Sequence, residues 1–171
     1  MIKGRFGPIL AAFLVLASAL PATAEGGPEA ALIAAVNAER TEAGLAPLVP
    51  EARLACAARA HARDLAASGR FSHAGSNGGD LTERLAAAGY PYAMAAENLA
   101  LAGAEAAEVV ALWRASPGHA RNMRAAGARA AGAARERGTD GRYLWVLVVG
   151  AERAKTAGFK PFSGKCAGNR G

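Results

Sequence analysis

The sequence predicts an α+β domain in which several helices pack on a sheet whose strands come late in the chain. Segments with helical spacing of apolar residues occupy the first two thirds and end at glycines. One long run of β-branched and aromatic residues follows in the last third. Once an N-terminal leader is set aside, 147 residues remain, which is the size of one ordinary domain. Helices followed by strands favour a layered α+β arrangement.

The leader, residues 1–24, has the three parts of a secretory signal peptide. Lys3 and Arg5 precede an apolar run over residues 9–20, and a small-residue A-x-A site ends at Ala24, where we expect cleavage. The apolar run has 12 residues, whereas a spanning helix needs about 20. The alternative is an uncleaved N-terminal anchor. The leader predicts an extracytoplasmic protein, periplasmic or secreted, with no transmembrane segment after cleavage.

Two helices are predicted in the first part of the mature chain. Residues 28–43 carry apolar side chains at helical spacing and end before Gly44. Residues 50–68 form the second helix, which ends before Gly69. Pro50 suits its first position, because the N–H that proline lacks would have no helical partner there.

A glycine-rich loop over residues 69–79 leads to a third, shorter helix. Asp80 and the glutamate three positions later form a capping box for this helix, which we expect to end near Ala88. Residues 90–96 are predicted to be a loop, and helical spacing returns over residues 104–115. The serine and proline that follow suit the cap and first position of another helical turn.

The strongest strand of the chain is predicted over residues 143–150. This run is β-branched and aromatic without polar alternation, so we expect both of its faces to be buried. An Asp-Gly turn at residues 139–142 precedes it, and residues 130–135 are a weaker strand candidate. Beyond residue 151 the chain becomes polar and rich in glycine.

The charge pattern argues against nucleic-acid binding. The formal net charge is +6, and it falls to +4 without the leader. No block of five like charges occurs, and no aromatic residues alternate with the arginines, as a nucleic-acid surface would require. A weak attraction to anionic polymers of the cell envelope is compatible with this charge. We expect a monomer.

Cys56 and Cys166 are the two cysteines of the chain. In an oxidising compartment an even number of cysteines favours a disulfide. The alternative is two independent thiols, with Cys56 simply buried. A bridge enclosing about 110 residues would stabilise the fold by about 4 kcal/mol in the chain-entropy treatment, and it would tether the tail, residues 153–171, to an early helix.

Three histidines are candidates for chemistry, and they differ in setting. His61 lies on the apolar stripe of a predicted helix and is interpreted as a packing residue. His73 and His119 lie in a loop and at a helix start, where sites concentrate. Glu97 has apolar neighbours, so its carboxylate needs a partner. Two imidazoles and a carboxylate suit a divalent metal site or acid–base chemistry. Alternatively, each histidine hydrogen-bonds only its own loop.

Several motifs occur in an order that resembles a known family. The main blocks are Asn37-x-x-Arg40-x-x-x-Gly44-Leu45-x-Pro47-Leu48, Phe71-Ser72-His73-x-Gly75, Glu97-Asn98-Leu99-Ala100 and Trp113-x-x-Ser116-Pro117-Gly118-His119-x-x-Asn122-Met123. Shorter matches are Asp80-x-x-x-Arg84, Gly89-Tyr90 and Tyr143-x-Trp145. The chain resembles the CAP superfamily of cysteine-rich secretory, antigen 5 and pathogenesis-related proteins, in its bacterial SCP-like extracellular form. The resemblance covers residues 29–152.

The resemblance implies a three-layer α-β-α sandwich with a wide cleft. In the family, two histidines and a glutamate line the cleft and can hold a divalent cation, and these correspond to His73, His119 and Glu97. Ser116 stands where the eukaryotic pattern has a second glutamate, which puts a four-residue cavity in doubt. Asp80 could supply a substitute carboxylate in the cleft, although its capping role is favoured.

Two functions follow, and the favoured one is a non-enzymatic secreted binding domain for a metal, small ligand, lipid or envelope polymer. Ser72 and His73 are adjacent, so their side chains point to opposite faces of an extended segment and make a poor nucleophile–base pair. The alternative is a metal-dependent hydrolase, in which His73 and His119 bind Zn²⁺ and Glu97 is the third ligand or the general base. Sterol or fatty-acid binding is implied by the family alone.

Overall fold

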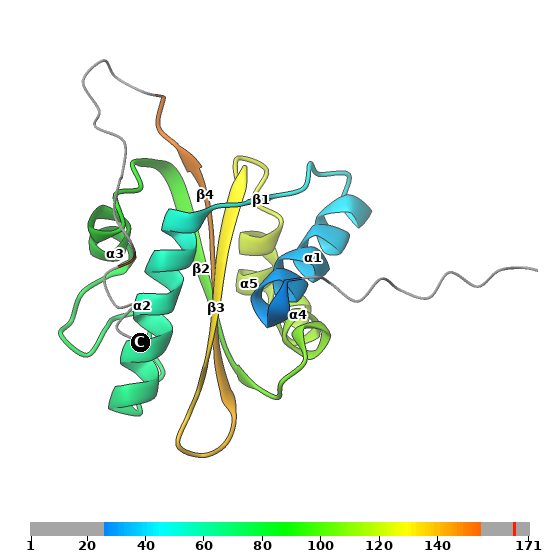
Figure 1. The fold of residues 1–171 in the computed structure, drawn as a ribbon. Coiled ribbons are helices and arrows are strands. Elements are labelled where there is room, and N and C mark those ends of the chain that lie inside the picture. The colour runs from blue at the N-terminus through cyan, green and yellow to red at the C-terminus, as the bar shows by residue number, and fades with distance from the viewer. Residues whose placement is uncertain (1–25, 155–165, 167–171) are drawn as a thin grey trace, which may run out of the picture.

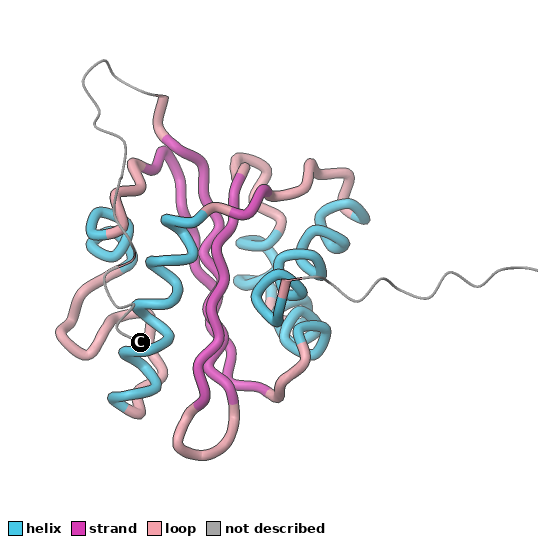
Figure 2. Tube along the Cα trace, viewed as in Figure 1, coloured by secondary structure: helices cyan, strands magenta, loops and turns pink. Residues whose placement is uncertain are grey.

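The computed structural model describes residues 26–154 and Cys166, so the predicted signal peptide and most of the tail lie outside the described residues. A four-stranded sheet lies between two layers of helices (Figures 1 and 2). One layer holds α2 and α3, and the other holds α1, α4 and α5. The elements are α1 Gly27–Glu42, β1 Val49–Pro50, α2 Ala52–Ser68, α3 Leu81–Ala87, β2 Tyr92–Ala102, α4 Ala106–Ala115, α5 Pro117–Met123, β3 Ala130–Arg137 and β4 Tyr143–Glu152. The predicted α-β-α sandwich is confirmed.

The strand order β1-β3-β4-β2 places β2 at one edge of the sheet. Strands β2 and β3 both run antiparallel to β4, while β1 pairs with β3 in parallel. Gly132 of β3 and Glu97 of β2 lie on either side of Val148. A Cβ atom at Gly132 would overlap the backbone nitrogen of Ala55. Helix α2 therefore lies directly on the backbone of β3.

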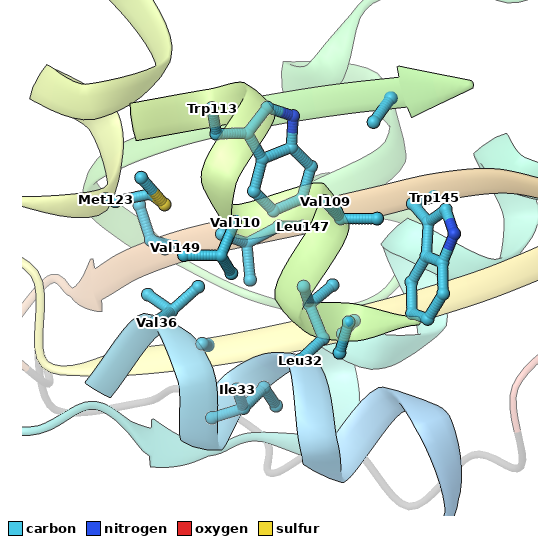
Figure 3. Packing of buried hydrophobic residues seen from close by; sticks show 14 of the residues in the cluster. Leu32, Ile33, Val36, Val109, Val110, Trp113, Met123, Trp145, Leu147 and Val149 are labelled. Carbon is cyan, nitrogen blue, oxygen red and sulfur yellow. The ribbon is translucent and has the colours of Figure 1, made fainter. Parts of the chain in front are cut away.

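The central strand β4 contributes to both cores, as the absence of polar alternation predicts. Trp145, Leu147 and Val149 pack with α1, α4 and α5 in the cluster that we call the first core (Figure 3). Val146 and Val148 pack with α2 and α3 in the second core. Seven consecutive residues of the strand are buried, from Leu144 to Gly150. Both faces of the sheet are thus closed by helices.

The predicted loop over residues 90–96 is wrong, because most of this segment belongs to strand β2. Its many alanines carry little intrinsic preference for a strand. The strand exists because it pairs with β4 along its length, from Tyr92↔Glu152 to Ala102↔Tyr143. This pairing is a contact between distant parts of the chain that local sequence does not reveal.

The predicted start of the second helix at Pro50 is also wrong, because Pro50 lies in the short edge strand β1. The amides of Val49 and Glu51 donate to the carbonyls of Arg129 and Ala131 at 3.0 and 2.8 Å. Pro50 has no N–H to donate. It lies between these two donors, at a position where the pairing with β3 needs no N–H group. Helix α2 begins two residues later, at Ala52.

The first sequence block has a structural role. The buried guanidinium of Arg40 donates to the carbonyls of Ala46 and Met123, each at 2.9 Å, which ties α1 to the end of α5. The Asn37 side chain donates to the Leu48 carbonyl and accepts from the Leu48 amide. These contacts fix the connector between α1 and β1, and they occupy the polar side chains of this block.

Cys56 and Cys166 form the predicted disulfide, with their Cα atoms 5.4 Å apart. The bridge joins the C-terminal region to α2, the helix that carries His61. In the part of the chain that the structure describes, none of the helices has the length and apolarity needed to cross a membrane.

Candidate functional site

Edge strand β2 brings the candidate residues together. Successive side chains of a strand point to opposite faces, and here Glu97 points to the α2/α3 layer while Asn98 points to α5. Asn98 donates to the His119 carbonyl at 3.1 Å, and Asn122 donates to the Glu97 carbonyl at 3.2 Å. Because β2 ends the sheet, groups from both helix layers can meet around its edge.

The Glu97 carboxylate is buried and fully engaged. Only 4% of its side chain is exposed. The Nη2 atom of Arg84 lies 2.9 Å from Oε2 and 3.1 Å from Oε1. The Nδ1 atom of His73 lies 2.9 Å from Oε1. The need for a partner, which the apolar surroundings of Glu97 predicted, is thus met by a guanidinium and an imidazole.

Arg84 also holds the loop that carries His73. Its Nη1 donates to the Gly79 carbonyl at 3.1 Å and its Nη2 to the His73 carbonyl at 3.2 Å. Helix α3 presents Arg84, and Asp80 caps that helix in the predicted capping box. The Asp80 Oδ1 atom accepts from the Glu83 amide at 3.0 Å. Asp80 therefore fixes the start of the helix that positions Arg84.

The His73 ring has one bound edge and one open edge. A carboxylate only accepts hydrogen bonds, so Nδ1 carries the proton that is donated to Glu97. The Nε2 atom of the neutral ring is then a lone-pair acceptor. The side chain is 61% exposed, so this acceptor is presented to solvent. An imidazole oriented by a carboxylate in this way has a fixed tautomer.

His119 approaches from the opposite layer, in the first turn of α5. Its ring lies 6.4 Å from the Trp113 ring, measured between centroids. Burial is the main cause that lowers the pKa of His119, and the nearby charge of His73 lowers it further. The effect of His73 on this pKa indicates that the two histidines, 46 residues apart in sequence, lie in the same region of the molecule.

Sequence reasoning missed two neighbours of Glu97, namely His61 and Arg84. His61 is 1% exposed, which agrees with its interpretation as a packing residue. However, its Nε2 donates to the Ser72 carbonyl at 3.0 Å and lies 3.7 Å from Glu97 Oε1. Burial lowers the pKa of His61 and keeps the ring neutral, although the charge of Glu97 opposes this effect. The Asp80-x-x-x-Arg84 block was the available signal for Arg84.

The described residues do not fit a three-ligand metal site. Among them, no three histidine, cysteine, aspartate or glutamate side chains gather where they could hold a metal ion. Arg84 explains why, because its guanidinium already supplies positive charge to Glu97 at hydrogen-bond distance. A structural or catalytic zinc site commonly needs at least three protein ligands. Of the three predicted ligands, Glu97 is thus paired with Arg84.

The architecture and site define a class, namely an α-β-α sandwich whose edge strand places a glutamate beside His73 on one side and an asparagine bound to the His119 carbonyl on the other. The model of the family described as "CAP: Cysteine-rich secretory protein family" matches residues 33–149. The chain therefore belongs to the CAP family, and the predicted family resemblance is confirmed.

Relatives and solved structures agree with this assignment. The chain is 33% identical over 95 residues to the uncharacterized protein YkwD of Bacillus subtilis (strain 168), and this match spans 56% of the chain but 37% of YkwD. The chain thus covers little more than a third of that relative's length.

Two solved structures show the same fold at lower identity. An outer surface protein from Borrelia burgdorferi has a TM-score of 0.65 at 23% identity, covering 71% of this chain and 90% of that one. An extracellular protein containing a SCP domain from Bacillus anthracis str. Ames has a TM-score of 0.63 at 22% identity, covering 71% of this chain and 40% of that one. At these identities the likeness establishes the fold alone.

Proposed function

We propose that this CAP domain is an extracytoplasmic binding domain without catalytic activity, whose ligand site is formed by the rings of His73 and His119. The observation that carries this proposal is the complete engagement of Glu97 by Arg84 and His73. In this arrangement Glu97 orients His73 and is not itself available to a ligand. The site would therefore offer two imidazoles to a small polar molecule or a divalent cation.

The engagement of Glu97 and of the two cysteines among the described residues supports a binding role. A general base needs a free lone pair within reach of the proton that it removes. The Glu97 carboxylate is buried and paired with the Arg84 guanidinium. The Ser72 Oγ atom accepts from the Ala74 amide at 3.1 Å, and the hydroxyl makes no hydrogen bond to a histidine nitrogen among the described residues. The two cysteines are joined in a disulfide and offer no thiolate. A hydrolase mechanism that uses Glu97 as general base or metal ligand would first have to release it from Arg84.

An extracytoplasmic location is supported by independent features. The leader has the parts of a signal peptide, and a disulfide persists mainly in oxidising compartments. Relatives of the same fold include the extracellular protein from Bacillus anthracis and a cysteine-rich secretory protein from Staphylococcus aureus. Fractionation of the native host, with mass spectrometry of the mature N-terminus, would test both the location and cleavage after Ala24.

A zinc titration tests the binding role. Calorimetry with Zn²⁺ alone should give weak, saturable binding that falls about tenfold or more in His73→Ala and in His119→Ala. Arg121→Ala is the matched control, because Arg121 is an exposed residue of the same helix as His119. Ligand imidazoles must be neutral, so binding should weaken as the pH falls below about 6.5. Unchanged zinc binding in both histidine variants would overturn the proposed cation contact.

An activity assay tests the absence of catalysis. Wild-type protein and Glu97→Gln are incubated with casein and with peptidoglycan, and released fragments are measured. We expect no turnover by either protein. Turnover by the wild type that disappears in Glu97→Gln, with a folded variant confirmed by circular dichroism, would establish a hydrolase instead.

A further inference from the structure

A second concave site lies between α2 and α3. Its wall shares His61 and Arg84 with the surroundings of Glu97 but does not include His73 or His119. We call it the α2–α3 pocket. Its volume is about 510 Å³, and its walls include His61 and Asp64 of α2, the loop over residues 75–79, and Arg84 of α3. Pockets that hold small molecules commonly have volumes of about 300–1,000 Å³. The pocket is therefore large enough for a small ligand.

Two residues of the pocket wall carry buried polar atoms without a hydrogen-bond partner in the described part of the chain. These atoms are His61 Nδ1 and Arg84 Nε. The opposite ring nitrogen of His61 donates to the Ser72 carbonyl, so Nδ1 of the neutral ring is an acceptor. Arg84 uses its Nη1 and Nη2 atoms for Gly79, His73 and Glu97, which leaves Nε–H as a donor.

Among the described residues, His61 Nδ1 lacks a hydrogen-bond donor, and Arg84 Nε–H lacks an acceptor. His61 and Arg84 are neighbours, because His61 Nε2 and Arg84 Nη2 lie 3.7 and 3.1 Å from the same Glu97 oxygen. A hydroxyl group can donate to His61 and accept from Arg84. A carboxylate has no proton for His61, and an ammonium has no lone pair for Arg84. Native proteins rarely leave buried polar atoms unmatched, so a group that both donates and accepts, such as a hydroxyl, fits the pair.

The rest of the pocket wall disfavours an anion. Both Asp64 oxygens accept from Ser76, one from its amide and the other from its hydroxyl. Glu83 also lines the pocket, and its Oε2 accepts from the Asp80 amide. Two carboxylates therefore face this space, whereas the positive charge of Arg84 is balanced by Glu97. Like charges at a binding site act against an anionic ligand.

We propose that the α2–α3 pocket binds a neutral, hydroxyl-rich ligand of the polyol or saccharide class. A ligand hydroxyl bridges His61 Nδ1 and Arg84 Nε, while the polar side chains of Ser76 and Asn77 meet further hydroxyls. Both bridged atoms are shielded from bulk solvent, so their engagement involves a small displacement of the wall side chains. This displacement gives the experiment its most specific signal, at the Arg84 Nε–H group.

Nuclear magnetic resonance tests the proposal with glucose as the neutral probe and glucuronate as its anionic counterpart. Glucose should give saturable shifts of the Arg84 Nε–H resonance and of the Ser76 and Asn77 amides. Glucuronate should bind about tenfold more weakly or not at all, because its carboxylate would be repelled by those of Asp64 and Glu83 in the pocket wall. No saturable shift with glucose would overturn the proposal, and equal binding of glucuronate would overturn the ligand class.

Variants of α3 localise the binding. Ala87 lines the pocket and is exposed, so Ala87→Leu should obstruct the opening and weaken glucose binding about tenfold or more. Ala86→Leu is the matched control, since Ala86 is exposed on the same helix and is not part of the pocket wall. Equal glucose binding by the two variants would overturn the assignment to this pocket. His73→Ala should retain glucose binding, which separates this result from the zinc titration.

Discussion

Replacing Arg84 by methionine tests whether its charge compensates the buried carboxylate of Glu97. Methionine keeps much of the length of the side chain but removes the guanidinium. Glu97 would then remain buried, with 4% of its side chain exposed, and His73 would be its one close hydrogen-bond partner within the described residues. Removing one partner of a buried ion pair costs about 3–5 kcal/mol. Arg84 itself is 11% exposed, so this range applies with little solvent screening.

The free energy of unfolding should therefore fall by about 3 kcal/mol or more in Arg84→Met, because the hydrogen bonds to the Gly79 and His73 carbonyls are lost as well. Urea unfolding followed by circular dichroism measures this change. Arg63→Met is the control, since Arg63 pairs with Glu136 on the surface at 46% exposure and should cost less than about 1 kcal/mol.

A double-mutant cycle then isolates the pair. Arg84→Met combined with Glu97→Gln removes both charges, so the double variant should be less destabilised than the two single changes added together. The coupling free energy should exceed about 1 kcal/mol, as is common for residues in direct contact. Strict additivity, or an Arg84→Met variant no less stable than Arg63→Met, would refute the view that Arg84 serves as the cation of this site.

Two further predictions concern stability. Burial lowers the pKa of His61 in the folded state, so the unfolded chain binds the proton more readily and the free energy of unfolding should fall as the pH drops below about 6.5. Urea midpoints measured between pH 7.5 and 5.5 should show this fall, and His61→Gln should reduce it; an unchanged pH dependence would contradict the assignment. Gly132→Ala places a methyl group against the backbone nitrogen of Ala55 and should cost about 3 kcal/mol or more. Gly127→Ala, whose new methyl would lie 3.7 Å from a Met94 side-chain atom, should leave the melting temperature nearly unchanged.

Local pattern was enough to predict elements whose stability depends on their own residues. The strand at residues 143–150 was recognised because its side chains suit a strand buried on both faces, and the capped helix after Asp80 was recognised from two residues of its first turn. Strand β2, Tyr92–Ala102, is not predicted as a strand in any part. Its alanines suit many conformations, and its partner β4 lies far along the chain.

In the candidate site, too, local motifs were predictable from the sequence, whereas contacts between distant parts of the chain were not. His73, Glu97 and His119 were recognised from motif order, whereas their spacing by itself left the shared site open. The role of Arg84 was not predictable, because its contact with Glu97 depends on how α3 is placed against the edge strand. His61 was interpreted correctly as buried, but only the folded chain shows that its ring faces a carboxylate.

The position of β4 between the two cores has a thermodynamic consequence. Neighbouring side chains of this strand belong to opposite cores, as Val146 and Leu147 illustrate, so neither helix layer can separate from the sheet without exposing β4. The amides of β4 should exchange with solvent only when the whole domain unfolds. A ligand held on one side of the sheet would then raise the stability of both layers equally. Binding at the histidine site and binding in the α2–α3 pocket would therefore shift the same folding equilibrium.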